Sequence, residues 1–288
     1  ALFLESIAFM FGWFRSKRQP LLKAAETGDL NTTRRLFETK SVNVETKDND
    51  GHTSLILAAR YGHIDVVRYL VEKAKANVEA EDDDGWTPLI WAARNGHVNT
   101  VLYIVEKANA HVEAKDKYGF TPLNMASRYG QVDAVRYLVE KVNANIEAKN
   151  DFGSTPLISA ACGHHIDTVQ YLVETANANV EAKQNDGSTS LIWAAINGRV
   201  GTVQYLVEKA NANIEAKDKY GGNSLIYAAL DDHIDVVRYL VEKANANVEA
   251  RNNDGKSALD VAVANKREGI VECLTKVETS VLVHHVVA

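Results

Sequence analysis

The chain has 288 residues, of which 32 are Lys or Arg and 38 are Asp or Glu, so its formal net charge is −6. A composition of 46% hydrophobic and 24% charged residues excludes an intrinsically disordered chain. The mildly acidic balance gives no electrostatic reason to bind nucleic acid, and two cysteines are too few for a disulfide-stapled secreted domain.

One phrase recurs along the chain at a fixed interval. It reads YLVEKAKANVEA at 69–80 and YLVEKANANVEA at 239–250, with close variants at 137–148 and 171–182. Glycines keep the same period of 34 residues, at Gly51, Gly85, Gly119, Gly153, Gly187, Gly221 and Gly255. A strict period of this length indicates a repeat protein.

The pattern within each repeat predicts two helices and a turn. Thr53 is a good N-cap before the apolar face that begins at Leu55. The four prolines follow such positions, at Pro20, Pro88, Pro122 and Pro156, where a first helical residue needs no N–H. Gly62 ends this first helix, and a second helix with Val66, Val67, Leu70 and Val71 as its buried stripe follows. It ends in Ala-Asn-Ala-Asn, where Asn can adopt the left-handed conformation, and the chain then forms a turn or hairpin up to the next marker glycine.

The stretch Gly85-Trp-Thr-Pro-Leu-Ile-Trp-Ala-Ala93, followed by Gly96-His97, resembles the ankyrin repeat. The resemblance implies an all-α solenoid of paired antiparallel helices with short hairpin connections, whose hairpins and first helices line a concave side. We expect about eight repeats, with an apolar stretch before them at 1–16 and an apolar tail after them at 277–288. The repeats lie at about 17–47, 48–81, 82–115, 116–149, 150–183, 184–217, 218–251 and 252–276.

Three features depart from the family pattern. Ile56, Ile90 and their equivalents replace the usual His, which favours apolar packing, and the period is 34 residues where the family has 33. Glu79 and its equivalents stand where the family often has Asn. In repeats 150–183 and 218–251, His164 and Asp232 replace the glycine that ends the first helix, so we expect local irregularity in both.

The histidines and cysteines, which could bind a metal or act in catalysis, are better explained as structural residues. His63, His97, His165 and His233 occupy one position of the repeat, too far apart to share a metal, and we expect each to bond locally at the start of the second helix. Cys162 and Cys273 lie three repeats apart and are isolated. We therefore predict no metal, no cofactor and no enzymatic activity.

Residues that vary between repeats at the hairpin tips and first helices are the positions where the resemblance places a protein partner. Aromatic residues beside arginine are typical of interface hot spots. An alternative is that these rings pack against the neighbouring hairpin. The predicted partner-binding residues are Arg60, Tyr61, Trp86, Arg94, Tyr118, Phe120, Arg128, Tyr129 and Phe152, with Trp86, Tyr118, Phe120 and Phe152 expected to be exposed.

Both ends of the chain are apolar, unlike the polar caps of most solenoids. They could cover the ends of their own solenoid, dock on another copy to form a filament, or, at the N-terminus, touch a membrane interface. The candidate self-assembly residues are Leu2, Phe3, Leu4, Phe9, Phe11, Trp13, Phe14, Val281, Leu282 and Val283.

The sequence thus predicts a cytoplasmic, non-enzymatic scaffold that binds another protein through its concave surface. The alternative is a structural subunit that self-assembles head-to-tail into a homo-oligomer or filament through its apolar ends.

Overall fold

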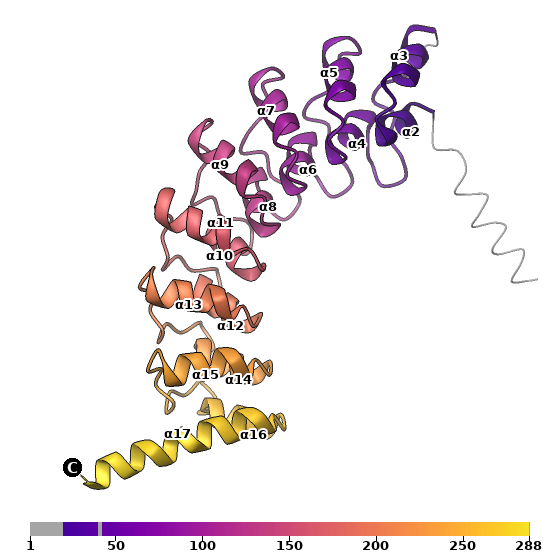
Figure 1. Ribbon diagram of the computed structural model, residues 1–288. Helices are drawn as coiled ribbons and strands as arrows, with labels where there is room; N and C mark the ends of the chain where they lie inside the picture. Colours follow the sequence, from indigo (N-terminus) through magenta and orange to yellow (C-terminus); the bar gives the residue numbers. More distant parts are fainter. Residues whose placement is uncertain (1–19, 40–41, 288) are drawn as a thin grey trace, which may run out of the picture. The chain divides into compact units, whose positions relative to one another are not determined.

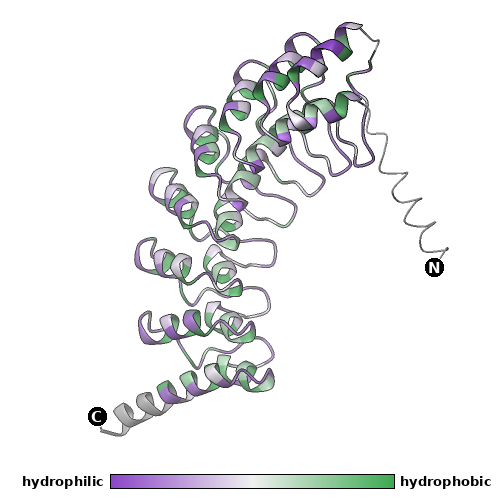
Figure 2. Cartoon of the chain, turned by 45° about the vertical axis from the view of Figure 1, so that its right-hand side comes forward, coloured by the Kyte–Doolittle hydropathy of each residue, from purple (hydrophilic) through white to green (hydrophobic). Residues whose placement is uncertain are grey.

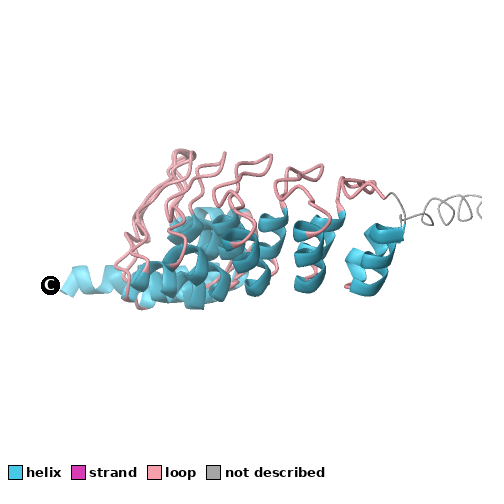
Figure 3. Cartoon of the chain, turned by 90° about the horizontal axis from the view of Figure 1, so that it is seen from above, coloured by secondary structure: helices cyan, strands magenta, loops and turns pink. Residues whose placement is uncertain are grey.

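A computed structural model of the chain describes residues 20–39 and 42–287, with side chains up to residue 277. The chain divides into two compact parts, Ala1–Lys117 and Tyr118–Ala288, which we call the N-terminal and C-terminal segments. The described residues form helices and loops without a strand (Figure 3). Within each segment, the hairpin loops project from the same side of the helices (Figure 3).

Each repeat contributes a first and a second helix (Figure 1), which confirms the predicted all-α solenoid of paired helices. First helices pack on first helices, as α4 does on α2 and α6, and α10 does on α8 and α12. The first helices are α2 (Pro20–Thr27), α4 (Ser54–Arg60), α6 (Pro88–Arg94), α8 (Pro122–Arg128), α10 (Pro156–Cys162), α12 (Ser190–Ile196), α14 (Ser224–Leu230) and α16 (Ala258–Ala264). The second helices are α3 (Leu30–Thr39), α5 (Ile64–Glu72), α7 (Val98–Glu106), α9 (Val132–Glu140), α11 (Ile166–Gln170) with η1 (Tyr171–Thr175), α13 (Val200–Glu208), α15 (Ile234–Glu242) and α17 (Glu268–Val287).

The predicted helix ends are confirmed. The side chain of Thr53 accepts a hydrogen bond from the backbone N–H of Ile56 at the start of α4, which satisfies one of the free donors of the first turn. Gly62 has φ +74°, and the ring of His97 lies 2.5 Å from where a Cβ would stand, so this position requires glycine. After the second helix, Asn109 has φ +56°, as expected for an Asn in the left-handed region.

The core lies between the helix layers of successive repeats. Leu55, Val67 and Leu70 are fully buried, and so are Ile56 and Ile90, the residues that replace the family's histidine. Burial of each such side chain contributes about 1.5–3 kcal/mol. Figure 2 shows hydrophobic residues concentrated in the helices and hydrophilic residues predominating in the loops. The apolar packing expected at the isoleucine position is therefore confirmed.

The histidine ladder bonds between repeats, which corrects the expected local role. His63 precedes α5 but makes no side-chain cap bond to it. Its Nε2 donates instead to the carbonyl of Glu26, 3.0 Å away in the preceding repeat, and His97 donates in the same way to the carbonyl of Arg60 at 3.0 Å. The last carbonyl groups of the preceding first helix lack intrahelical partners. They are therefore available to accept a hydrogen bond from the histidine.

A glutamate ladder also joins successive repeats. Glu147 Oε1 accepts a hydrogen bond from the backbone N–H of Asn179 at 2.8 Å, and Glu181 accepts from Asn213 at 2.8 Å. The N-terminal segment repeats the contact, with the Glu79 carboxylate accepting from the backbone N–H of His111 at 2.8 Å. The glutamates that replace the family's Asn are thus inter-repeat hydrogen-bond acceptors.

A tyrosine ladder on the second helices makes a third inter-repeat contact. The hydroxyl of Tyr103 donates to Glu72 Oε1 at 3.1 Å, and the hydroxyl of Tyr205 donates to Glu174 Oε1 at 3.0 Å. Burial and this hydrogen bond raise the pKa of both phenols to about 12, because both favour the neutral hydroxyl. The tyrosine ladder is therefore part of the scaffold.

One of the two expected irregularities is present. In repeat 150–183, Gly163 ends α10 in an extended conformation, and the second helix changes from α11 to the π-helix η1. In repeat 218–251 the expectation was wrong: Asp232 itself adopts φ +66°, the conformation of the missing glycine, and α15 keeps its regular form. An Asp tolerates this region better than most residues.

The C-terminal tail continues the last second helix. α17 runs from Glu268 to Val287, so the boundary drawn after residue 276 falls inside one helix. Within the described ranges, no helix combines the length and the apolar character that crossing a membrane requires.

The glutamate ladder predicts a position-dependent loss of stability. Glu181→Ala should lower the free energy of unfolding by about 1 kcal/mol, because the N–H of Asn213 loses its acceptor. Urea denaturation followed by circular dichroism measures the change. Glu249 occupies the same position in the last full repeat and has no such bond to the described residues, so Glu249→Ala is the matched control. Equal losses in the two variants would contradict the inter-repeat role.

The tyrosine ladder predicts a loss of stability in alkali. An unfolded tyrosine ionises near pH 10, whereas the folded Tyr205 has a pKa of about 12. Its contribution is therefore complete below pH about 10 and lost as the pH rises towards about 12. The midpoint of thermal unfolding should fall less steeply over this range in Tyr205→Phe than in the wild-type chain. Parallel curves for the two proteins would rule out the coupling.

Candidate protein-binding surface

The predicted partner-binding residues fall in two groups. Arg60, Tyr61, Trp86 and Arg94 belong to the N-terminal segment, and Tyr118, Phe120, Arg128, Tyr129 and Phe152 belong to the C-terminal segment. The two groups have different surroundings, so each is described by itself.

In the N-terminal segment, the aromatic and arginine side chains pack on one another. The Trp86 and Trp91 rings lie 4.5 Å apart between centroids, and the guanidinium carbon of Arg60 lies 4.1 Å from the Trp91 centroid. Arg94 lies over both rings, 5.5 Å from Trp86 and 5.4 Å from Trp91. Trp86, which was expected to be exposed, is half-buried: its ring packs on Trp91 of its own first helix and not on a neighbouring hairpin. Tyr61 is 43% exposed.

A hydrogen bond between hairpin and first helix anchors this cluster. Asp82 Oδ1 accepts from the backbone N–H groups of Asp84 and Trp86, which fixes the turn. Its other oxygen, Oδ2, accepts from the indole Nε1 of Trp91 at 2.7 Å, nine residues further on. The same pair recurs in the C-terminal segment, where the hydroxyl of Tyr227 donates to Asp218 Oδ2. We call this contact the hairpin–helix pair.

The hairpin–helix pair is missing in repeats 150–183 and 184–217, and repeat 116–149 also lacks it because Met125 stands at the helix position. In repeat 150–183 the two positions hold Asn150 and Ser159, and in repeat 184–217 they hold Gln184 and Trp193. Among the described residues, Asn150 Nδ2 and Trp193 Nε1 are buried atoms without a hydrogen-bond partner. Each such donor costs about 1–3 kcal/mol when buried from water.

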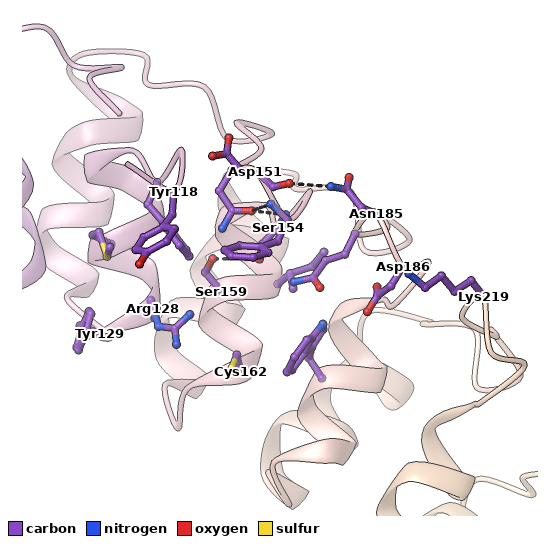
Figure 4. Close-up of a pocket in the computed structure, with 17 residues that line it drawn as sticks. Tyr118, Arg128, Tyr129, Asp151, Ser154, Ser159, Cys162, Asn185, Asp186 and Lys219 are labelled. Atoms are coloured by element: carbon purple, nitrogen blue, oxygen red, sulfur yellow. Dashed lines mark hydrogen bonds between the residues drawn. The ribbon is translucent and has the colours of Figure 1, made fainter. Parts of the chain in front are cut away.

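A pocket of about 650 Å³ opens at these mismatched positions. Figure 4 shows Tyr118, Arg128 and Ser159 towards one side of it and Asn185, Asp186 and Lys219 towards the other. Asn150 and Trp193 both line the pocket. All five predicted partner-binding residues of the C-terminal segment line it as well: Tyr118, Phe120, Arg128, Tyr129 and Phe152.

The aromatic residues of the pocket differ in exposure. Tyr118 is 48% exposed and Phe152 is 54% exposed, and their stacked rings lie 6.3 Å apart between centroids. Phe120 is only 8% exposed, which corrects its predicted exposure: its ring packs at 6.4 Å from Phe152 and beneath Arg128 at 5.8 Å. Phe152 thus contacts one exposed ring, Tyr118, and one buried ring, Phe120.

The formal charges of the residues that line the pocket sum to zero. The lining contains two basic residues, Arg128 and Lys219, and two acidic residues, Asp151 and Asp186. Asp186 Oδ1 accepts from the backbone N–H of Ser188, which ties this carboxylate into its own turn. The lining therefore has no net formal charge and gives no long-range preference for a charged ligand.

Two other groups of reactive side chains form hydrogen bonds with nearby protein groups. Ligand atoms of Asp48, Asp50 and His52 lie within 4.8 Å of one another, but His52 Nδ1 lies 3.1 Å from Asp48 Oδ2 and the cluster forms a hairpin turn. Cys162 lines the pocket, and its Sγ accepts from the Asn197 amide at 3.7 Å.

The predicted self-assembly residues are not tested. Leu2, Phe3, Leu4, Phe9, Phe11, Trp13 and Phe14 lie outside the described residues, and Val281, Leu282 and Val283 lie in α17 beyond its described side chains. Their role stays a prediction.

Sequence reasoning missed the pocket itself. Variation between repeats indicates the aromatic residues at its mouth. Asn150 and Ser159, taken singly, carry no such signal. The signal lies in the pair: Asp82 with Trp91 and Asp218 with Tyr227 are nine residues apart, and the same spacing relates Asn150 to Ser159.

Comparison with known proteins identifies the repeat. The family model described as ankyrin repeats (3 copies) matches residues 7–82, 74–150, 142–218 and 210–283. No curated protein sequence matches the chain significantly. Ankyrin repeats are generally scaffolds for protein–protein interaction and are typically non-enzymatic. Since the four matches together extend from residue 7 to residue 283, the chain belongs to the ankyrin repeat family.

Proposed function

We propose that this chain is a non-enzymatic scaffold that binds another protein through the hairpin and first-helix face of its C-terminal segment, centred on the pocket. The observation that carries the proposal is the pair of exposed rings, Tyr118 and Phe152, at a pocket of about 650 Å³. Large aromatic residues around a concavity are the usual anchors of a protein interface.

The energetics of the surface support this role. An aromatic side chain buries a large area on binding and has few rotatable bonds to immobilise. Tyr118 and Phe152 are also held against each other before any partner arrives, and inter-repeat hydrogen bonds hold their hairpins, as when the backbone N–H of Asp151 donates to the carbonyl of Tyr118 at 3.0 Å. A preorganised surface loses little entropy on association.

The chemistry of the pocket supports binding over catalysis. Cys162, Ser154 and Ser159 are nucleophile types in its lining, and the lining includes no histidine to activate any of them. The aromatic residues of the N-terminal segment, by comparison, already use their faces for internal stacking. The C-terminal segment therefore offers the more available binding face.

The proposal predicts that partner capture depends on the exposed rings. Tyr118→Ala and Phe152→Ala should each weaken binding of retained proteins at least about tenfold, because a buried anchor ring contributes about 1.4 kcal/mol or more. Quantitative pull-down with the whole chain as bait measures the change. Tyr61→Ala is the control, since Tyr61 is also exposed but lies in the N-terminal segment. Retention unchanged by both pocket variants, or lost equally in the control, would overturn the proposal.

A further inference from the structure

Another repeat of the chain shows which group fills the place that the pocket leaves open. In repeat 82–115 this place holds the buried indole of Trp91. The residues in contact with that indole are Asp82, Trp86 and Arg94 of its own repeat, and His52 and Arg60 of the preceding one. Two periods further along the chain, the equivalent residues are Asn150, Ser154, Cys162, Phe120 and Arg128, and all five line the pocket (Figure 4). The pocket is therefore the Trp91 site without its ring.

Two rings are missing from this place. Ser159 stands at the position of Trp91, and Ser154 stands at the position of Trp86. The two serine hydroxyl groups bond to each other at 3.3 Å. Replacement of two indoles by two hydroxymethyl groups explains why a pocket opens here.

The arginine of the site lacks the ring that its equivalents carry. Arg60 Cζ lies 4.1 Å from the Trp91 centroid and Arg94 Cζ lies 5.4 Å from it, and both arginines are half-buried. Arg128, at the position of Arg60, is exposed. A guanidinium group stacks favourably on an aromatic face, so Arg128 favours an aromatic group in the open place.

The other walls of the pocket also suit a ring. Met125 contributes a thioether, Phe152 an exposed ring and Trp193 a half-buried ring. Sulfur atoms and aromatic rings both make favourable contacts with an aromatic side chain. The lining has no net formal charge, so nothing in it selects an ionic group.

The acceptor that serves the Trp91 indole is absent from the pocket. Asp82 Oδ2 accepts from Trp91 Nε1 at 2.7 Å, whereas Asn150 has an amide at this position. The amide oxygen already accepts from the backbone N–H groups of Phe152 and Ser154, at 3.0 and 2.8 Å. An indole in this place would bury an N–H without that acceptor, which is unfavourable. A phenylalanine ring has no donor and avoids this cost.

We propose that the pocket binds the side chain of a phenylalanine in an exposed segment of a partner protein. The inference rests on the proposed function and names the anchor residue of its partner. The phenylalanine ring takes the place of the missing indole, and Arg128 stacks on it as Arg60 stacks on Trp91. Tyr118 and Phe152 pack on the residues that flank it. One aromatic side chain in a fitted pocket is the typical anchor of such an interface.

A selection of random linear peptides on the whole chain tests this chemistry. The enriched peptides should share a phenylalanine. The counterpart is Asn150→Asp combined with Ser159→Trp, the filled variant, which restores the pair found at Asp82 and Trp91. It should bind the selected peptides at least about tenfold more weakly, because its own indole occupies the place of the anchor ring.

Changes to one selected peptide separate aromatic character from size. Cyclohexylalanine resembles phenylalanine in shape but has no aromatic face. In its place, it should weaken binding about two- to fivefold in a fluorescence-anisotropy titration, through loss of the stacking on Arg128. Tryptophan should weaken binding about tenfold, because its N–H finds no acceptor.

Arg128→Leu tests the stacking from the side of the protein. The difference between the phenylalanine and cyclohexylalanine peptides should shrink in this variant, because the guanidinium is gone. An unchanged difference would overturn the role of Arg128 in the choice of an aromatic anchor. Arg128 is exposed, so the variant serves as the test even if the filled variant does not fold. Circular dichroism and the unfolding midpoint verify the fold of both.

The outcomes distinguish this inference from the function on which it rests. Selected peptides that require the open pocket but carry tryptophan, leucine or a charged residue in place of phenylalanine would overturn the phenylalanine anchor and leave the binding surface intact. Peptides that bind the filled variant as tightly as the wild-type chain, or a selection without enrichment, would overturn both.

A peptide of residues 1–18 tests the other source of such a side chain, a second copy of this chain. It contains Phe3, Phe9, Phe11 and Phe14. We expect it to bind more weakly than the selected peptides. Binding of equal strength that is lost in the filled variant would overturn the separate partner and make a second copy the occupant.

Discussion

The structure depends on hydrogen bonds that join successive repeats and recur at the same positions of the repeat. Because the period is constant, a carboxylate that accepts a backbone N–H once, as Glu147 does from Asn179, accepts it again one repeat later. The histidine and tyrosine ladders obey the same rule. A single repeat is too small to form a hydrophobic core alone. Its neighbours cover its apolar face and bond to its buried polar groups. Conformity to one repeat pattern is therefore what stabilises the fold.

At the candidate site, the residues that contact each other within one repeat have changed, while the residues that bond to the next repeat have not. Asn150 and Ser159 replace the hairpin–helix pair, while Lys149 in the same hairpin still donates to the carbonyl of Lys183 at 3.0 Å. The scaffold tolerates the change because the altered residues contact their own repeat. The unsatisfied donors and the missing ring volume remain as local features of an otherwise regular surface.

The fold was readable from the sequence because its determinants are local and repeated. Thr53, Gly62 and Asn109 predict a cap, a stop and a left-handed turn from their residue types, and the structure confirms all three. The role of His63 was not readable, because its acceptor lies 37 residues away in another repeat. Phe120 was expected to be exposed, but its ring packs on Phe152 in the next hairpin, as the alternative of packing between hairpins had it. The pocket could be predicted only by comparing residue pairs between repeats, since neither Asn150 nor Ser159 is unusual alone.

The hairpin–helix pair has a consequence for how such surfaces diversify. Both of its members belong to one repeat, although Trp91 also contacts Arg60 and Ile56 of the preceding repeat. The glutamate and tyrosine ladders use other side chains, such as Glu181 and Tyr205. Two substitutions can therefore open or close a cavity at a chosen repeat while the glutamate and tyrosine ladders on either side are kept. Recognition and architecture are encoded at separate positions of the same unit, so duplication of a repeat followed by change at two sites creates a new specificity on an unaltered frame.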